Sequence, residues 1–287
     1  MRLGRFLPRC IMIKMRTYLS NLLSPIVREV INQTSTPQVS DIEALLRQSL
    51  STIHHELNIP PVPPKHLQVR VVGGYVPGFI ESGFQTFEDL NEVLKTAGKS
   101  LNDFESILDF GCGCGRNIRA LRTRLPAATL CGMDIDGEAI GWLTQHYRSF
   151  GTFTVAPHNP PTALEDSRFD FIFGISVFTH LPEDLQFAWL EELRRISKPG
   201  GYLVLTTHGE NHYKNMDSGI LKIMKSKGFF YIDSGYGQRI ELPEFYQNTY
   251  HSHDYVRREW EKYFDILDIR ALGMGNHQDT VLMRNRR

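Results

Sequence analysis

The stretch that most constrains the fold is SILDFGCGCGRNIRAL, residues 106–121. It runs from an apolar segment typical of a buried strand, through glycines at alternating positions, into a segment with helical spacing. A strand followed at once by a glycine loop and a helix is the first half of a βαβ unit, which builds parallel sheets. Glycine permits positive φ and a close approach to the backbone, so a phosphate, a nucleoside or another backbone segment could lie over the loop.

Strands and helices alternate on both sides of this loop. The pattern predicts strands at 105–110, 128–135, 152–156, 169–175 and 198–208, and helices at 116–125, 137–150 and 183–196. This alternation indicates a parallel sheet with helices on both faces, which is a Rossmann-like three-layer α/β/α sandwich. Near the C-terminus, a helix over 253–263 capped by Ser252 precedes two closely spaced apolar segments, 264–272 and 279–285. We expect these two segments to pair antiparallel at the sheet edge.

The region before the loop is predicted to be helical and then extended. An amphipathic pattern predicts a helix over 41–57, and the proline-rich segment 58–66 predicts an extended spacer. We therefore expect a helical N-terminal extension with its linker, residues 1–66, and one α/β domain, residues 67–287.

Two further segments of the domain are assigned from local patterns. A capping pattern at Thr86 and Asp89 predicts a helix over 86–99 that ends at Gly98. The aromatic segment 228–237 is typical either of an acceptor pocket or of a lid or core strand.

Charge and cysteine usage narrow the class of protein. The formal net charge is zero, so no overall field favours nucleic acid. The four cysteines show no disulfide framework, which indicates a reducing, cytoplasmic location. Basic residues interrupt the apolar N-terminal 31 residues, which match neither a membrane span nor a secretory signal. We expect a soluble protein whose first helix caps the domain, with membrane contact by this basic helix as the alternative. The sequence does not define the oligomeric state.

The loop does not fit the dinucleotide fingerprint G-x-G-x-x-G. If Gly111 and Gly113 are its first two glycines, Arg116 stands where the third should be. Asp109, at the end of the strand, would repel a pyrophosphate and attract a cationic group. Asp134 follows the next strand at the offset from which a carboxylate binds ribose hydroxyls. A nucleoside with a positive end, such as S-adenosyl-L-methionine, meets both requirements.

Four blocks carry a family resemblance: LDFGCGCGR, GMDID, FDFIFGISVFTHLP and LRRISKPGGYLVLTTH. In order and spacing they resemble the signature blocks of class I S-adenosylmethionine-dependent methyltransferases, over roughly residues 104–210. The resemblance implies a seven-stranded, mostly parallel sheet with an antiparallel last strand. A weaker similarity, which includes PPKHLQVRVVGG and NHQDTVL, is to methyltransferases of bacterial surface-polysaccharide biosynthesis.

The resemblance also implies which residues bind the cofactor. Asp109 would lie near the amino end of the methionine moiety, Asp134 would hold the ribose, and Ile135 would pack on the adenine. The family often has an acidic residue for the adenine amino group; this chain has APHNPP, so His158 or Asn159 would serve. The remaining predicted cofactor contacts come from the loop and from the end of the fourth strand: Gly111, Cys112, Gly113, Gly115 and Ile175.

The implied reaction transfers a methyl group to a small-molecule or glycan acceptor, with oxygen as the favoured atom. A hydroxyl acceptor needs a base near its proton. His208 and His180, after the fifth and fourth strands, are the predicted catalytic residues. The other candidates for the base are Glu210, Tyr250, His251, His253 and His277.

Metal binding is not expected, because Cys112 and Cys114 lack a second pair at zinc spacing. Two alternatives to a methyltransferase remain. One is a nicotinamide-dependent oxidoreductase, and the other is an inactive S-adenosylmethionine-binding partner or regulator.

Overall fold

The computed structural model describes residues 60–73, 78–232 and 243–286. The helix predicted over 41–57 lies outside the described residues, with everything before Pro60. A compact unit extends from Val62 to Arg287. Residues 60–64 contain no helix or strand, as the prolines predict, and helix α3 (Lys65–Val72) follows directly.

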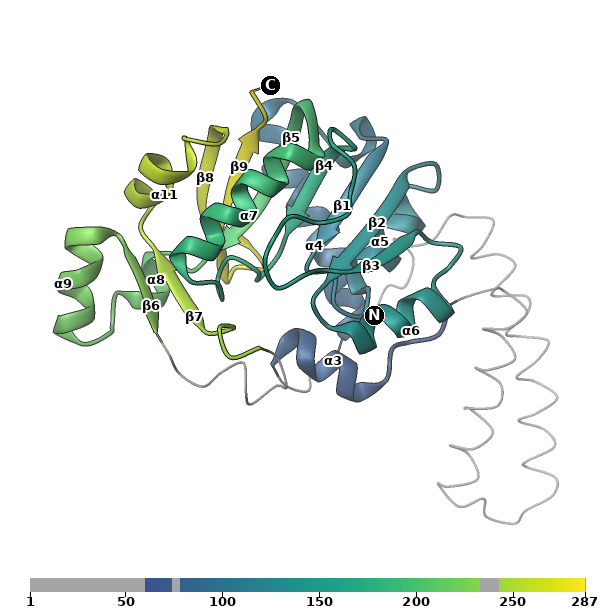
Figure 1. Ribbon diagram of the computed structural model, residues 1–287, viewed down its shortest axis with the longest axis horizontal. Helices are drawn as coiled ribbons and strands as arrows, with labels where there is room; N and C mark the ends of the chain where they lie inside the picture. Colours follow the sequence, from purple (N-terminus) through teal and green to yellow (C-terminus); the bar gives the residue numbers. More distant parts are fainter. Residues whose placement is uncertain (1–59, 74–77, 233–242, 287) are drawn as a thin grey trace, which may run out of the picture. The chain divides into compact units, whose positions relative to one another are not determined.

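A seven-stranded sheet in the order β3-β2-β1-β4-β5-β9-β8 forms the centre of this unit (Figure 1). Its strands are β1 (Ser106–Phe110), β2 (Thr129–Asp134), β3 (Thr152–Val155), β4 (Phe169–Gly174), β5 (Ser197–Thr207), β8 (Asp265–Met274) and β9 (Gln278–Arg284). The first five pair in parallel, and β9 is antiparallel to both β5 and β8. The predicted mostly parallel sheet with a reversed last strand is confirmed. Its order reverses between β1 and β4, so a crevice opens beyond their carboxyl ends.

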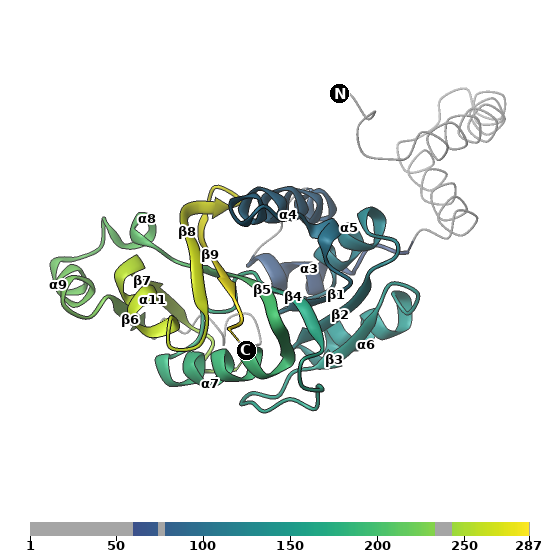
Figure 2. The same ribbon diagram turned by 90° about the horizontal axis from the view of Figure 1, so that it is seen from above.

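Helices cover both faces of the sheet, which confirms the three-layer sandwich. On one face pack α4 (Phe79–Leu94), α5 (Arg116–Arg124) and α6 (Gly137–His146); on the other pack α7 (Glu183–Ile196) and α11 (His253–Trp260). Figure 2 shows α4 and α7 on opposite sides of the strands. Successive strand side chains point to opposite faces, so Ile107 joins the first layer and Leu108 the second. Ser252 caps α11 as predicted, since its Oγ accepts the Tyr255 N–H at 3.1 Å.

The predicted start of the helix at Thr86 is wrong. Helix α4 begins at Phe79, and the Thr86 hydroxyl donates to the Ser82 carbonyl at 3.1 Å, as it does inside a helix. The Thr86 and Asp89 pattern lies inside the helix and caps nothing. Gly83, also inside the helix, is required by packing, because a Cβ there would meet the carbonyl of Arg116 on α5. Gly98 ends the helical region as predicted, because it caps the 3₁₀ turn Lys95–Ala97 that follows α4 and has a φ of 65°.

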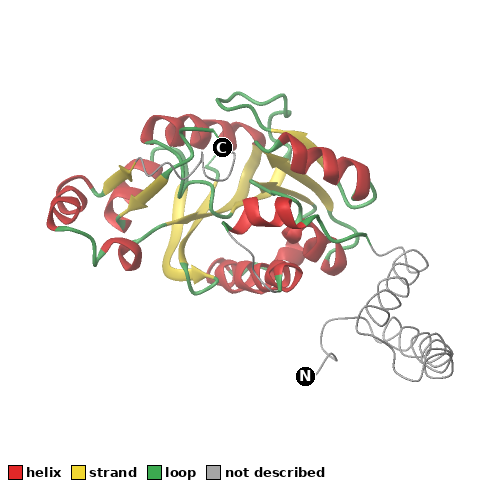
Figure 3. Ribbon diagram, turned by 90° about the horizontal axis from the view of Figure 1, so that it is seen from below, coloured by secondary structure: helices red, strands yellow, loops and turns green. Residues whose placement is uncertain are grey.

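A small α/β segment is inserted between β5 and β8. It contains α8 (Glu210–Tyr213), α9 (Ser218–Lys227) and a two-stranded antiparallel sheet of β6 (Phe229–Ile232) and β7 (Asn248–His251). Figure 3 shows this small sheet beside the main sheet. The His251 N–H donates to the His208 carbonyl at 2.9 Å, which joins β7 to the end of β5. The aromatic segment 228–237 therefore supplies β6, and its last five residues lie outside the described part of the chain.

Gln186 of α7 ties the loop after β4 to the small sheet. It is fully buried, and its Nε2 donates to the carbonyls of Phe178 at 3.0 Å and Leu181 at 2.9 Å. Its Oε1 accepts from His251 Nε2 at 2.9 Å.

We expect Gln186→Leu to lower the free energy of unfolding by about 1–3 kcal/mol, because buried polar groups lose their partners. Urea unfolding measures this. Gln85→Leu, on the exposed side of α4, should change it by less than about 0.5 kcal/mol, and equal effects would contradict the assignment.

Candidate active site

The glycine loop between β1 and α5 has a backbone that requires glycine. Gly111, Gly113 and Gly115 have φ of 82°, 51° and 85°, in the left-handed region that side chains disfavour. The Gly111 and Cys112 N–H groups both donate to the Met133 carbonyl, at 2.7 and 3.1 Å, so the loop is fixed across the end of β2.

Side chains from three other segments lie against these glycines. A Cβ at Gly111 would meet Val177, which follows β4, and one at Gly113 would meet Val71 of α3. A Cβ at Gly115 would meet Leu143 of α6 at 2.5 Å. Gly115 therefore serves the packing of α5 on α6, whereas the first two glycines lie at the rim of an open space.

That space is a cavity of about 950 Å³, counting the part open to solvent, at the carboxyl ends of β1, β2 and β4. Six of the predicted cofactor-binding residues line it: Gly111, Cys112, Gly113, Asp134, Ile135 and Ile175. Asp109, Gly115 and Asn159 are not in the lining, and His158 is. Four further lining residues were not predicted as site residues: Arg70 and Val71 of α3, and Phe245 and Tyr246 before β7. The first two lie in the segment PPKHLQVRVVGG, whose similarity to methyltransferases was the available signal.

Asp109 is fully buried at the end of β1, directly before the lining residue Phe110. Neither carboxyl oxygen has a hydrogen-bond partner among the residues that the structure describes. Burial raises the pKa of Asp109 to about 8, although the Arg116 guanidinium and the Asn117 amide oppose the rise. A buried polar group without a partner requires an explanation, and a cationic or hydrogen-bonding ligand at this end of β1 supplies one.

Asp134 connects the loop to β2. Its Oδ2 accepts the Gly113 N–H at 2.6 Å, and its Oδ1 accepts the Asp136 N–H at 2.9 Å. Burial raises the pKa of Asp134 to about 6, although these backbone bonds oppose the rise. A carboxylate oxygen has two lone pairs, so each can accept a second bond from a ligand hydroxyl.

These groups fit a nucleoside with a cationic end. Two acidic side chains lie at the strand ends, and the cavity wall includes apolar side chains such as Phe110, Ile175 and Trp189. Arg70, which also lines the cavity, pairs with Asp136 at 2.9 Å. A pyrophosphate would meet the two carboxyl groups, whereas the ammonium, sulfonium and ribose of S-adenosylmethionine match them.

The two predicted catalytic histidines lie behind the cavity wall. His180 stacks on the lining residue Tyr246, with ring centroids 4.3 Å apart, and its Nδ1–H donates to the Gln247 carbonyl at 2.7 Å. The His208 ring centroid is 6.0 Å from that of His180. Burial lowers the pKa of His180 to about 4 and, with nearby imidazoles, that of His208 to about 2. Both are neutral at pH 7, and such low values make weak proton acceptors.

The three other histidines among the candidates for a base have structural partners or lie in a separate cluster. His251 is buried against Gln186, and His253 bonds Asp279 at 2.7 Å. His277 approaches His208, together with His212, a residue that sequence reasoning missed. The H-x-x-x-H spacing of His208 and His212 was the available signal.

Comparison with known proteins assigns the family. Residues 84–265 match the family model described as Methyltransferase domain. The match covers more than half of the chain, which therefore belongs to the methyltransferase domain family.

Individual relatives are distant. The chain is 25% identical over 128 residues to the malonyl-[acyl-carrier protein] O-methyltransferase of Hahella chejuensis, covering 42% of this chain and 45% of the relative. It is 25% identical over 111 residues to the fatty-acid O-methyltransferase of Mycolicibacterium smegmatis, covering 39% and 40%. The chain thus spans less than half the length of these relatives. The solved structure of the PH0226 protein from Pyrococcus horikoshii OT3 shares the fold, with a TM-score of 0.51 and 17% identity over 73% of this chain and 92% of that one.

The predicted class I S-adenosylmethionine-dependent methyltransferase is confirmed, with S-adenosylmethionine as its cofactor. An oxidoreductase does not fit this family. The link to surface polysaccharides and the cytoplasmic location stay predictions. Among the described residues, no helix combines the length and apolar character needed to cross a membrane.

Asp109 generates a prediction about stability. Its pKa lies above the ordinary 3.8, near 8, so between these values the folded chain binds more protons than the unfolded chain. The free energy of unfolding should therefore fall as the pH rises from about 4 to about 8. Asp109→Asn removes this contribution, and without ligand we expect it to be more stable than wild type at about pH 8 by roughly 1 kcal/mol or more. Urea unfolding at about pH 5 and about pH 8 tests this; parallel pH dependences in both proteins would contradict it.

Proposed function

We propose that this protein transfers the methyl group of S-adenosylmethionine to a carboxylate oxygen of a small-molecule acceptor. The observation that carries the proposal is the position of the two predicted catalytic histidines: neither His180 nor His208 lines the cavity, and the lining residue Tyr246 stacks on His180. A carboxylate is already ionised at neutral pH and needs no base, whereas a hydroxyl must lose a proton. The two distant relatives, named for malonyl-[acyl-carrier protein] and fatty-acid O-methylation, support an acyl acceptor.

Within this proposal, residues at the ends of β1 and β2 hold the cofactor. Asp109 binds the ammonium group, Asp134 binds the ribose hydroxyls, and Ile135 packs on the adenine. His158 replaces Asn159 beside the adenine, because His158 lines the cavity and Asn159 does not. Gly111 and Gly113 let the cofactor approach the loop backbone.

The chain's own contribution to the reaction is positioning and exclusion of water. When bound, S-adenosylmethionine supplies an electrophilic methyl group whose transfer to a carboxylate gives a methyl ester and a neutral thioether. Leu181 and Trp189 give the wall beside Tyr246 an apolar surface, where a carboxylate loses part of its hydration and becomes more reactive. No proton has to be moved to or from a side chain.

A matched pair of acceptors tests the proposal. Labelled S-adenosylmethionine is supplied with a fatty acid and with the alcohol of the same chain length, beside a malonyl thioester and a panel of sugars and lipid-linked glycans. We expect label in a methyl ester of an acid, and at least about a hundredfold less in the alcohol, because only the acid presents an ionised oxygen. Label that enters only hydroxyl groups would contradict the carboxylate assignment and favour a glycan acceptor. Cofactor binding without turnover on any acceptor would favour a regulatory protein.

Asp134 gives a separate test of the cofactor site. Asp134→Ala should weaken S-adenosylmethionine binding by about 10- to 100-fold, because the ribose hydroxyls lose a charged acceptor and the Gly113 N–H loses its partner. Isothermal titration calorimetry measures the affinity. Asp166→Asn, on an exposed side chain outside the cavity lining, is the control and should bind like wild type. An unchanged affinity in Asp134→Ala would show that the ribose lies elsewhere.

A further inference from the structure

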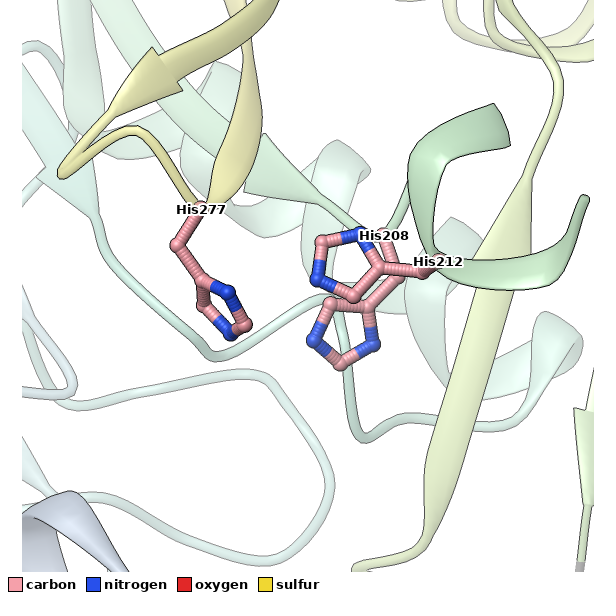
Figure 4. Close-up of side chains that lie close together, drawn as sticks. All are labelled: His208, His212 and His277. Atoms are coloured by element: carbon pink, nitrogen blue, oxygen red, sulfur yellow. The ribbon is translucent and has the colours of Figure 1, made fainter.

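Three histidines from separate elements converge beyond the cavity wall (Figure 4). His208 follows β5, His212 lies on the single turn of α8, and His277 lies in the turn between β8 and β9. One ligand nitrogen from each lies within 4.8 Å of the others. The ring centroids are 4.4 Å apart for His208 and His212, and 4.7 Å apart for His212 and His277.

The backbone holds these side chains at one edge of the sheet. Residue Thr207 of β5 pairs with Asp279 of β9, which brings the segments carrying His208 and His277 together. Gly209 allows α8 to turn back beside them, because a Cβ at this position would collide with the Asp279 carboxylate. The cluster is therefore set by pairing in the main sheet.

Two of these imidazoles have buried nitrogens that lack partners. His208 is 8% exposed, and neither its Nδ1 nor that of His212 makes a hydrogen bond to any described residue. Leaving such groups unpaired costs about 1–3 kcal/mol each. His277 is exposed, so one side of the cluster is open to solvent.

We propose that His208, His212 and His277 bind one divalent transition metal ion of the zinc type. Three imidazole nitrogens with an open fourth position are the ligand set of a catalytic rather than a closed structural zinc site. Zinc–nitrogen bonds of about 2.0–2.1 Å place tetrahedral ligand atoms roughly 3.4 Å apart, so side-chain shifts of about 1 Å close the site. The proposal departs from the expectation of no metal, which considered only the cysteines.

The chemistry of the ligands selects the metal. Imidazole nitrogen suits Zn²⁺ and its neighbours, whereas Mg²⁺ and Ca²⁺ take oxygen ligands. The buried Asp279 carboxylate, which lies against Gly209, the residue that follows His208, supplies negative charge near the cation. Its own oxygens bond Leu272 N–H at 2.9 Å and His253 Nε2 at 2.7 Å, so it acts from outside the ligand set.

The test measures metal binding and does not depend on methyl transfer. The full chain is freed of metal with a chelator, dialysed against Zn²⁺ and assayed for bound zinc and for its unfolding temperature. We expect one Zn²⁺ per chain bound by these residues, and a rise in the unfolding temperature. His277→Ala removes an exposed ligand with little risk to folding. Zinc binding by this variant should be weaker by more than about a hundredfold, because His277 is a direct ligand and the loss of a residue that only supports a ligand already costs 10- to 100-fold.

His146→Ala, on the exposed surface of α6, is the matched control and should bind zinc like wild type. His208→Ala and His212→Ala should repeat the loss seen with His277→Ala. Wild type that binds no zinc, binding that is equal in His277→Ala and His146→Ala, or displacement of zinc by excess Mg²⁺ would each overturn the proposal. Failure of the carboxylate proposal would leave these results unaffected, because no acceptor is used.

Discussion

The bond between Asp134 and the Gly113 N–H is the contact on which the cofactor site depends. It joins the glycine loop after β1 to the end of β2 at 2.6 Å, while the same side chain also holds the turn into α6 through Asp136. The loop is consequently fixed before any ligand arrives, and Gly111 and Gly113 line the cavity in one conformation. Asp109 lies beside this fixed loop, fully buried and without a partner among the described residues. Beside this preorganised loop, a buried carboxyl group that only Arg116 and Asn117 partly compensate favours a cation at the end of β1, and it destabilises the empty protein at high pH.

Sequence reasoning succeeded where local patterns and sheet periodicity agree. The bounds 183–196 for the helix after Pro182 match α7, because the apolar spacing and the proline coincide. It failed at α4, because a capping pattern such as that of Thr86 and Asp89 also occurs inside a helix, where the Thr86 hydroxyl bonds the Ser82 carbonyl. The cofactor-binding residues at the strand ends could be predicted from the sequence, because the strand order brings the carboxyl ends of these strands together. Wall residues such as Val71 and Tyr246 come from segments outside the alternating pattern, so only the tertiary structure could place them.

The inserted segment between β5 and β8 contributes Phe245 and Tyr246 to the cavity wall. Its strand β7 bonds to the end of β5 and to the loop after β4, through the N–H groups of His251 and Thr249. Tyr246, just before β7, enters the cavity wall and covers His180. Covering the imidazole in this way removes it from water, and this is why it is a poor base. The same insertion therefore shapes the apolar wall and weakens the nearest candidate for a base.

Ser176 links the cavity to the histidine cluster. This lining residue has φ 60°, a strained value for a residue with a side chain, and bonds from three directions hold it there. Its N–H donates to Thr206 Oγ1 at 2.8 Å, its Oγ accepts from Gln278 at 2.7 Å, and its carbonyl accepts from Tyr246 at 3.2 Å. Thr206 lies two residues before His208, and Gln278 directly follows His277. Ser176 therefore ties the cavity wall to the ends of β5 and β9, the two paired strands beside which the histidine cluster lies.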